Sequence, residues 1–335
     1  MPRMERLPAA GKMNSLSSQP QKKFFPEMIS RRNIRVKVMQ ELYAKQSGGS
    51  ETGKSDPVAD LQKQLDHSSQ LFIYLLYFLT EVARYAETDS RIRLSKNLPT
   101  HEDRNVNIKI SGNEMLWKIL ESESFKKATG KSLEFSDTRD MVKKVYNELA
   151  GTDEYLRYIN KMGRDKKEEK DIIVFIFTNL MLPSDYFVQH VEEHFVNWDD
   201  DAEMMDQLMM NYLNRPGSYD LQQMVGEEKW KFAKTLLLTA IEKMEYATEL
   251  IKPKLKNWDA DRIAALDMIL MQMGVCELLY FETIPPKVTI NEYIDLAKDY
   301  STPQSGQFVN GILDSIHKEL VAEQKIHKID FRQKA

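Results

Sequence analysis

The sequence from Ile263 to Ile316 decides the fold, and it reads IAALDMILMQMGVCELLYFETIPPKVTINEYIDLAKDYSTPQSGQFVNGILDSI. Its first part, residues 263–281, is apolar nearly all round, which is typical of a helix buried on every side. Thr289 and Glu292 have capping-box spacing, which predicts that a second helix begins there. Thr302, followed by a proline, predicts the start of a third helix. Three consecutive helices indicate a small helical bundle.

The rest of the chain also has helical patterns. Residues 31–46 carry an apolar stripe at helical spacing, with Ser30 as the expected N-cap, and residues 58–86 form a long apolar-rich pattern. Further helical patterns follow up to residue 252, with a break at Pro216 and Gly217. Glycine and proline are scarce whereas Leu, Met, Glu and Lys are plentiful, which favours helix over sheet. The sequence therefore predicts an all-α protein.

Four parts are expected along the chain. They are a flexible basic extension over residues 1–27, an N-terminal helical bundle over 28–220, a C-terminal helical bundle over 221–322 and a tail over 323–335. Residues 60–220 contain many aromatic side chains, which loops could not leave exposed. We therefore expect this region to fold as helices that enlarge the N-terminal bundle around the first helix.

Charge is distributed unevenly. Residues 1–37 hold nine Arg and Lys against two Glu, although the whole chain has a net charge of -4. This skew is typical of an arm that binds a polyanion, but a basic tail without a ligand would look the same. Charge alone leaves both interpretations open.

Cysteine count and hydropathy indicate the cellular compartment of the protein. Cys276 is the one cysteine, so an intrachain disulfide or a cysteine metal cluster is excluded, as is typical of the reducing cytoplasm. No apolar run approaches the roughly 18 residues of a membrane span, and the N-terminus lacks the apolar segment of a secretory signal. We expect a cytoplasmic protein with no membrane partner.

Residues 48–55, GGSETGKS, fit the P-loop pattern for nucleotide binding letter for letter. A P-loop needs a buried strand before it and a helix that starts at its lysine, here Lys54. The preceding segment instead continues a helical pattern, and Pro57 follows closely. The composition also suits a flexible linker, which is the interpretation we prefer.

Residues 190–194, HVEEH, fit a zinc-protease pattern, because histidines four residues apart on a helix can share a metal. The match is short, and Phe187, Val191 and Phe195 make the same segment an ordinary amphipathic helix. We therefore expect no metal site, and no nucleophile set for catalysis is apparent either.

A longer ordered set of motifs carries a resemblance to a known family. It comprises Glu277–Leu278, Pro286–Lys287–Val288, Ile290–Asn291–Glu292, Ile294, Leu296–Ala297–Lys298 and Phe308 through Asp314, together with Arg31–Arg32, Arg35 and Leu42–Tyr43 in the first helix. This string closely resembles the NusB family of bacterial transcription antitermination factors. The resemblance covers roughly residues 29–46 and 228–320, and the stretch of about 180 residues between them is longer than in a typical member.

The resemblance implies a fold and a function. The fold is two small helical bundles packed together, here with an enlarged N-terminal bundle. The function is binding of the boxA RNA element, as a heterodimer with the ribosomal protein NusE, in the transcription elongation complex during rRNA transcription. No catalytic residue, cofactor or metal is implied.

The first helix supplies half of the expected RNA site. On a helical wheel Arg31 and Arg35 fall on the apolar side, so each would overhang the bundle edge or meet a ligand. Arg32 shares a flank with Tyr43, and a guanidinium beside an aromatic ring suits single-stranded RNA. Considered without the family, the residues would favour surface arginines and a core tyrosine over an RNA site.

The start of the last helix supplies the other half. The resemblance implies RNA contact by Gln304, Ser305, Gln307 and Phe308, where a helix N-terminus favours phosphate and a ring can stack. This chain departs from the family, which often has an acidic residue at 304, His at 306 and Lys at 307. The missing lysine removes one electrostatic contact from the site.

Two classes of enzyme are alternatives. NusB-like domains precede methyltransferase domains in RNA-modifying enzymes, but no glycine-rich methyl-donor motif with a downstream catalytic cysteine follows residue 320. A P-loop nucleotide-binding protein is the other alternative, and it depends on residues 48–55 alone.

Overall fold

The computed structural model describes residues 28–47, 56–130, 138–255 and 264–329. Within these ranges the protein has fourteen α-helices and no strand, which confirms the all-α prediction. The helices are α1 (Arg31–Ser47), α3 (Pro57–Leu94), α4 (His101–Arg104), α5 (Glu114–Leu120), α6 (Glu123–Gly130), α7 (Thr138–Ala150), α8 (Asp153–Asn160), α9 (Lys166–Phe175), α10 (Asp185–His194), α11 (Trp198–Asn214), α12 (Glu227–Ile251), α13 (Ala265–Tyr280), α14 (Pro286–Tyr300) and α15 (Ser305–Ala322). Short 3-10 turns occupy Lys109–Gly112 and Lys252–Leu255, and a π-helix occupies Ile176–Met181.

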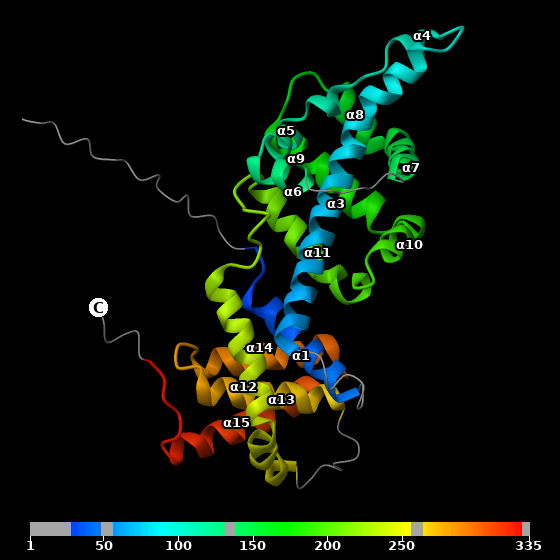
Figure 1. The fold of residues 1–335 in the computed structure, drawn as a ribbon. Helices are drawn as coiled ribbons and strands as arrows, with labels where there is room; N and C mark the ends of the chain where they lie inside the picture. The colour runs from blue at the N-terminus through cyan, green and yellow to red at the C-terminus, as the bar shows by residue number, and fades with distance from the viewer. Residues whose placement is uncertain (1–27, 48–55, 131–137, 256–263, 330–335) are drawn as a thin grey trace, which may run out of the picture.

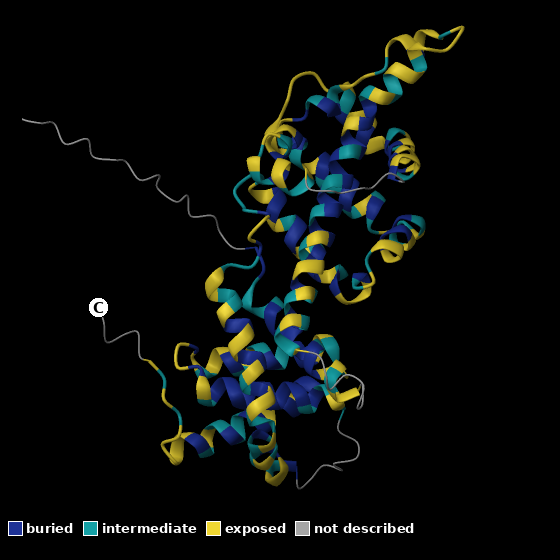
Figure 2. Cartoon of the chain, viewed as in Figure 1, coloured by how far each residue is buried: buried dark blue, intermediate teal, exposed yellow. Residues whose placement is uncertain are grey.

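The helices form two packed bundles (Figure 1). The enlarged N-terminal bundle is built on the 38-residue helix α3, and α5 to α11 gather around it. The C-terminal bundle consists of α12 to α15. Figure 2 shows buried residues along the inner faces of both bundles. The domain boundary near residue 220 stays a prediction, because α12 of the second bundle also packs on α1 and α3.

Helix α1 lies at the junction of the two bundles. It packs on α12 and α13 on one side and on α3 on the other, and eight of its residues are buried. Three of the buried residues are charged, and each has a partner on a different helix: Arg35 on α13, Lys37 on α11 and Glu41 on α3. Because a buried charge is costly without a partner, these pairs fix how α1 sits between its neighbours.

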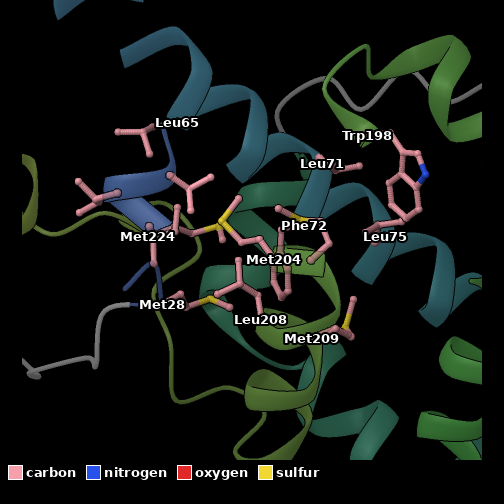
Figure 3. Close-up of a cluster of buried hydrophobic side chains, with 14 of the residues drawn as sticks. Met28, Leu65, Leu71, Phe72, Leu75, Trp198, Met204, Leu208, Met209 and Met224 are labelled. Atoms are coloured by element: carbon pink, nitrogen blue, oxygen red, sulfur yellow. The ribbon is translucent and has the colours of Figure 1, made fainter. Parts of the chain in front are cut away.

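The contact between the N-terminal segment and the enlarged bundle is rich in methionine. Figure 3 shows Met28, Met204 and Met224 converging with leucines of α3 and α11, and all three methionines are buried. The backbone N–H of Ile29 donates to the carbonyl of Met224 at 3.1 Å. Flexible methionine side chains fill irregular gaps, which suits a place where a non-helical segment meets two helices.

Helix α13 is buried on nearly all sides, as its apolar sequence predicts. A Cβ atom at Gly274 would lie 2.9 Å from Cδ1 of Leu313 on α15 and 3.3 Å from the ring of Tyr293 on α14. Glycine is therefore needed here so that α14 and α15 can pack closely on α13.

One of the three predicted helix starts discussed above agrees with the structure, and two do not. Ser30 caps α1 as expected, because its Oγ accepts from the N–H of Asn33 at 3.1 Å. The predicted start at Thr289 is wrong, since α14 begins at Pro286 and Thr289 lies inside it. The predicted start at Thr302 is wrong too, since α15 begins at Ser305.

No single described helix is long and apolar enough to span a membrane. Among the described helices, Lys166–Met181 and Asp185–His194 pass that test when taken together, and they are joined at a bend of 83°.

Candidate nucleic-acid interface

Arg35 is buried against a carboxylate of the C-terminal bundle. Its Nε and Nη2 donate to the two oxygens of Glu277 at 2.9 and 2.8 Å, and its Nη1 lies 3.4 Å from Glu292. Burial alone would lower the pKa of Arg35, but the hydrogen bonds and charge of Glu277 raise it above its ordinary value. Arg35 therefore stays charged. The helical wheel predicted that Arg35 would overhang the bundle edge or meet a ligand. In the structure it binds a buried carboxylate of the protein itself.

Glu277 is held from several sides. The hydroxyls of Thr289 and Tyr293 donate to its carboxylate at 2.8 and 3.2 Å, in addition to the two bonds from Arg35. Burial and the charge of Glu277 raise the pKa of Tyr293 well above its ordinary value, so the phenol keeps the proton that it donates. This network occupies the donors of Arg35 that an RNA phosphate would need, and RNA contact by Arg35 stays a prediction.

Arg31 and Arg32 lie at the exposed start of α1. The Nη2 of Arg31 donates to Glu228 on α12 at 2.6 Å, and the guanidinium lies 5.4 Å from the ring centre of Phe232. The Nη2 of Arg32 donates to Asp299 on α14 at 2.6 Å. Both side chains are about one-third exposed, so a ligand can reach them.

Tyr43 is exposed near the other end of α1. It follows Arg32 by eleven residues, which is about 16 Å along a helix. The two share a flank of α1 as the helical wheel predicts, but they are too far apart to contact one phosphate together. Stacking of a base on Tyr43 stays a prediction.

At the start of α15 the four expected residues divide into two kinds. Gln304 and Gln307 are exposed, whereas Ser305 and Phe308 are buried. The hydroxyl of Ser305 donates to Asp267 on α13 at 2.8 Å, which ties the first turn of α15 to the core. Gln304, Gln307 and Phe308 also line a surface cavity of about 440 Å³ together with Lys254, Gly311, Ile312 and Ser315. RNA contact by this turn also stays a prediction.

The other motifs have structural explanations where they are described. The P-loop match at residues 48–55 lies outside the described residues, but the helix α1 runs directly up to it at Ser47, where a P-loop would need a strand. The Nε2 of His190 lies 2.5 Å from the hydroxyl of Tyr74, and the Nδ1 of His194 lies 2.8 Å from the carbonyl of His190. Among the described residues no group of three or more His, Cys, Asp or Glu is placed to hold a metal.

Cys276 is buried in α13, and burial raises the pKa of its thiol to about 12. It therefore behaves as a small core residue, as its apolar setting predicts.

Comparison with known proteins assigns the family. The model of the NusB family matches residues 186–318, from α10 into α15. Transcription antitermination protein NusB of Finegoldia magna is 40% identical over 114 residues, which cover 32% of this chain and 83% of that protein. The chain belongs to the NusB family. The matched residues begin at 186, before the second part of the motif string at about 228, and they do not include α1.

A second relative is matched over a smaller share. Transcription antitermination protein NusB of Salinibacter ruber is 45% identical over 97 residues, 29% of this chain and 61% of that protein. The crystal structure of T. maritima NusB is 28% identical, with 41% of this chain and 89% of that chain covered, at a TM-score of 0.28. The present chain is larger than the part it shares with its NusB relatives.

The acidic partners of the arginines could not be identified from the sequence pattern. Glu228, Glu277 and Asp299 each lie about 200 or more residues from the arginine they bind. One signal was available, since Glu277 is, with Asp267, one of two charged residues in the largely apolar helix α13 and so requires a buried partner.

Proposed function

We propose that this chain is a cytoplasmic transcription antitermination factor that binds boxA-type single-stranded RNA together with the ribosomal protein NusE in the elongation complex, without catalysis. The observation that carries the proposal is where the two halves of the expected RNA site lie. Arg32 binds Asp299 near the C-terminal end of α14, and Gln304 at the start of α15 follows five residues later. The start of α1 and the first turn of α15 therefore both adjoin the C-terminal end of α14.

This arrangement suits a flexible anion. Exposed guanidinium groups at the start of α1 can bind phosphate oxygens, and the exposed amides Gln304 and Gln307 can hydrogen-bond to bases or sugars. The largely buried ring of Phe308 lines the nearby cavity, so a base that entered this cavity would meet an apolar wall.

The C-terminal bundle also offers a surface for a protein partner. Leu238 and Ile241 lie one turn apart on α12, and both are exposed apolar residues. The same helix packs on α1 at the junction of the two bundles. We propose that NusE docks there, on the helices of residues 228–320, while the RNA binds the start of α1 and of α15.

Fluorescence anisotropy with a labelled boxA-type RNA tests the proposal, with and without NusE. We expect the wild-type chain to bind this RNA more tightly than a scrambled RNA of equal length, and NusE to strengthen binding. Arg31→Ala/Arg32→Ala should weaken binding and reduce its salt dependence by roughly 0.7 slope units for each phosphate that is no longer neutralised.

Arg91→Ala is a matched control, because Arg91 is an exposed arginine that pairs with Glu87 near the far end of α3. It should leave RNA affinity unchanged. Equal affinity for boxA-type and scrambled RNA, or equally weakened binding in both sets of variants, would contradict the proposal.

A further inference from the structure

Lys298 lies across the first turn of α15. A Cβ atom at Gly306 would come within 2.7 Å of Cγ and 3.1 Å of Cε of Lys298, so the absence of a side chain at Gly306 makes room for the lysine stem. The ammonium group remains exposed and lies 3.1 Å from Asp295. Residues 304–308 contain no cation of their own. Lys298 therefore places a positive charge beside a turn that otherwise lacks one.

The same carboxylate links Lys298 to Arg32. The Nη1 of Arg32 lies 3.8 Å from Asp295, and its Nη2 donates to Asp299 at 2.6 Å. Arg32, Asp295, Lys298 and Asp299 thus form one group, the α14 charge cluster. All four side chains are between 33% and 57% exposed, so solvent and ligands reach each of them.

We infer that the α14 charge cluster is an RNA phosphate site in which Lys298 is a binding residue and Asp295 and Asp299 are resting counter-ions that the phosphate displaces. The inference rests on the proposed function, and it adds Asp295, Lys298 and Asp299 to the proposed RNA site. It also explains why Arg32 and Lys298 both lie beside Asp295, since a single phosphate can accept hydrogen bonds from a lysine and an arginine at once.

The energies of the ion pairs favour such an exchange. Ion pairs between exposed side chains are weak, so releasing Arg32 and Lys298 from the carboxylates costs little. The phosphate is expected to approach from the α15 side. Towards α11 the surface beside Arg32 carries another carboxylate, Glu203, which would repel it.

The counter-ions make a specific prediction about salt. When an RNA phosphate binds Arg32, Asp299 loses its partner and attracts a cation from solution. This uptake cancels part of the release of cations from the RNA. A variant without the carboxylate takes up no such cation, so the net release is larger. Asp299→Asn and Asp295→Asn should therefore each raise affinity for a boxA-type RNA by about two- to fivefold at moderate salt. The salt dependence should become steeper by up to about 0.7 slope units.

Lys298→Gln should have the opposite effect and weaken binding with a shallower salt dependence. The exposed pair Asp314 and Lys318 on α15 supplies matched controls, because its separation of 2.6 Å and its exposure resemble those of the cluster. Asp314→Asn and Lys318→Gln should leave affinity and salt slope unchanged. Thermal melting of each variant checks that the fold is intact.

Gly306→Ala tests how Lys298 is placed. The added methyl group must displace the lysine stem, so it should weaken RNA binding in the wild-type background. It should have no further effect once Lys298→Ala has removed Cγ and Cε, whereas damage to α15 itself would persist in the double variant.

The outcomes separate the two proposals. If wild-type chain prefers boxA-type RNA but the cluster variants match their controls, the inference is wrong and the proposed function stands. If wild-type chain binds boxA-type and scrambled RNA equally but the cluster variants still change the affinity and salt slope, the phosphate site stands and the sequence-specific function falls. If no RNA binds, both are wrong.

Discussion

Arg35 on α1 and Glu277 on α13 form a two-pronged buried ion pair, with donor–acceptor distances of 2.9 and 2.8 Å, at the place where the two bundles meet. Arg35→Ala would leave Glu277 buried without its cation, which typically costs about 3–5 kcal/mol in the free energy of unfolding. Urea denaturation measures this destabilisation. All three arginines of the helix start were expected to contact RNA, but Arg35 is buried whereas Arg31 and Arg32 are about one-third exposed.

Arg31→Ala is the control for that measurement. Its pair with Glu228 is exposed, so we expect a destabilisation of about 1 kcal/mol or less. If Arg35→Ala were equally mild while RNA binding collapsed, Arg35 would be an RNA ligand and not a residue that holds the bundles together.

A second buried pair joins α1 to the enlarged bundle. Lys37 pairs with Asp201 on α11, and the other oxygen of Asp201 accepts from Ser68 on α3 and from Asn197 at 2.6 Å each. Asp201→Ala should therefore destabilise the protein by about 3 kcal/mol or more. It should also speed amide hydrogen exchange in α11 more than in α14.

Glu203→Ala on the same helix is the control for Asp201, because Glu203 is exposed. Similar exchange rates in the two variants would mean that the buried pair does not couple α1 to α11.

His190 offers a test of the zinc motif. Its ring lies 2.5 Å from the hydroxyl of Tyr74 and packs among aromatic side chains, so it has a structural role in the enlarged bundle. We expect His190→Ala to cost about 1–3 kcal/mol of stability, because the buried Tyr74 hydroxyl loses a partner. RNA affinity should not change. Stoichiometric zinc in the purified protein that disappears in this variant would contradict the structural role.

Local sequence patterns predicted much of the fold but not the pairing of charges. The apolar sequence of α13 identified the central helix, and Ser30 identified the start of α1. The start of α14 was missed because Thr289 and Glu292 have capping-box spacing, yet Pro286 suits the first helical position and Thr289 is used by Glu277.

The candidate site was predicted only in part for the same reason. The arginines of α1 could be found from helical spacing, but their carboxylates lie on α12, α13 and α14. A local sequence pattern does not predict which pairs of helices pack together. Arg31 and Arg35 therefore look similar in the sequence, because both fall on the apolar side of the helix, although Arg35 is buried and Arg31 is about one-third exposed.

We expect RNA and the protein partner to bind different parts of the two bundles. Apart from Tyr43, the expected RNA contacts lie at the start of α1 and of α15, whereas α11 exposes Asp199 and Asp200 in its first turn. Phosphate is repelled by such a surface, so the enlarged bundle is a poor place for RNA. Hydrogen exchange with saturating boxA-type RNA should therefore show protection at residues 31–35 and 304–308 and little change across residues 166–212. NusE should instead protect α12. RNA-induced protection confined to residues 166–212 would place the RNA on the enlarged bundle and overturn this division.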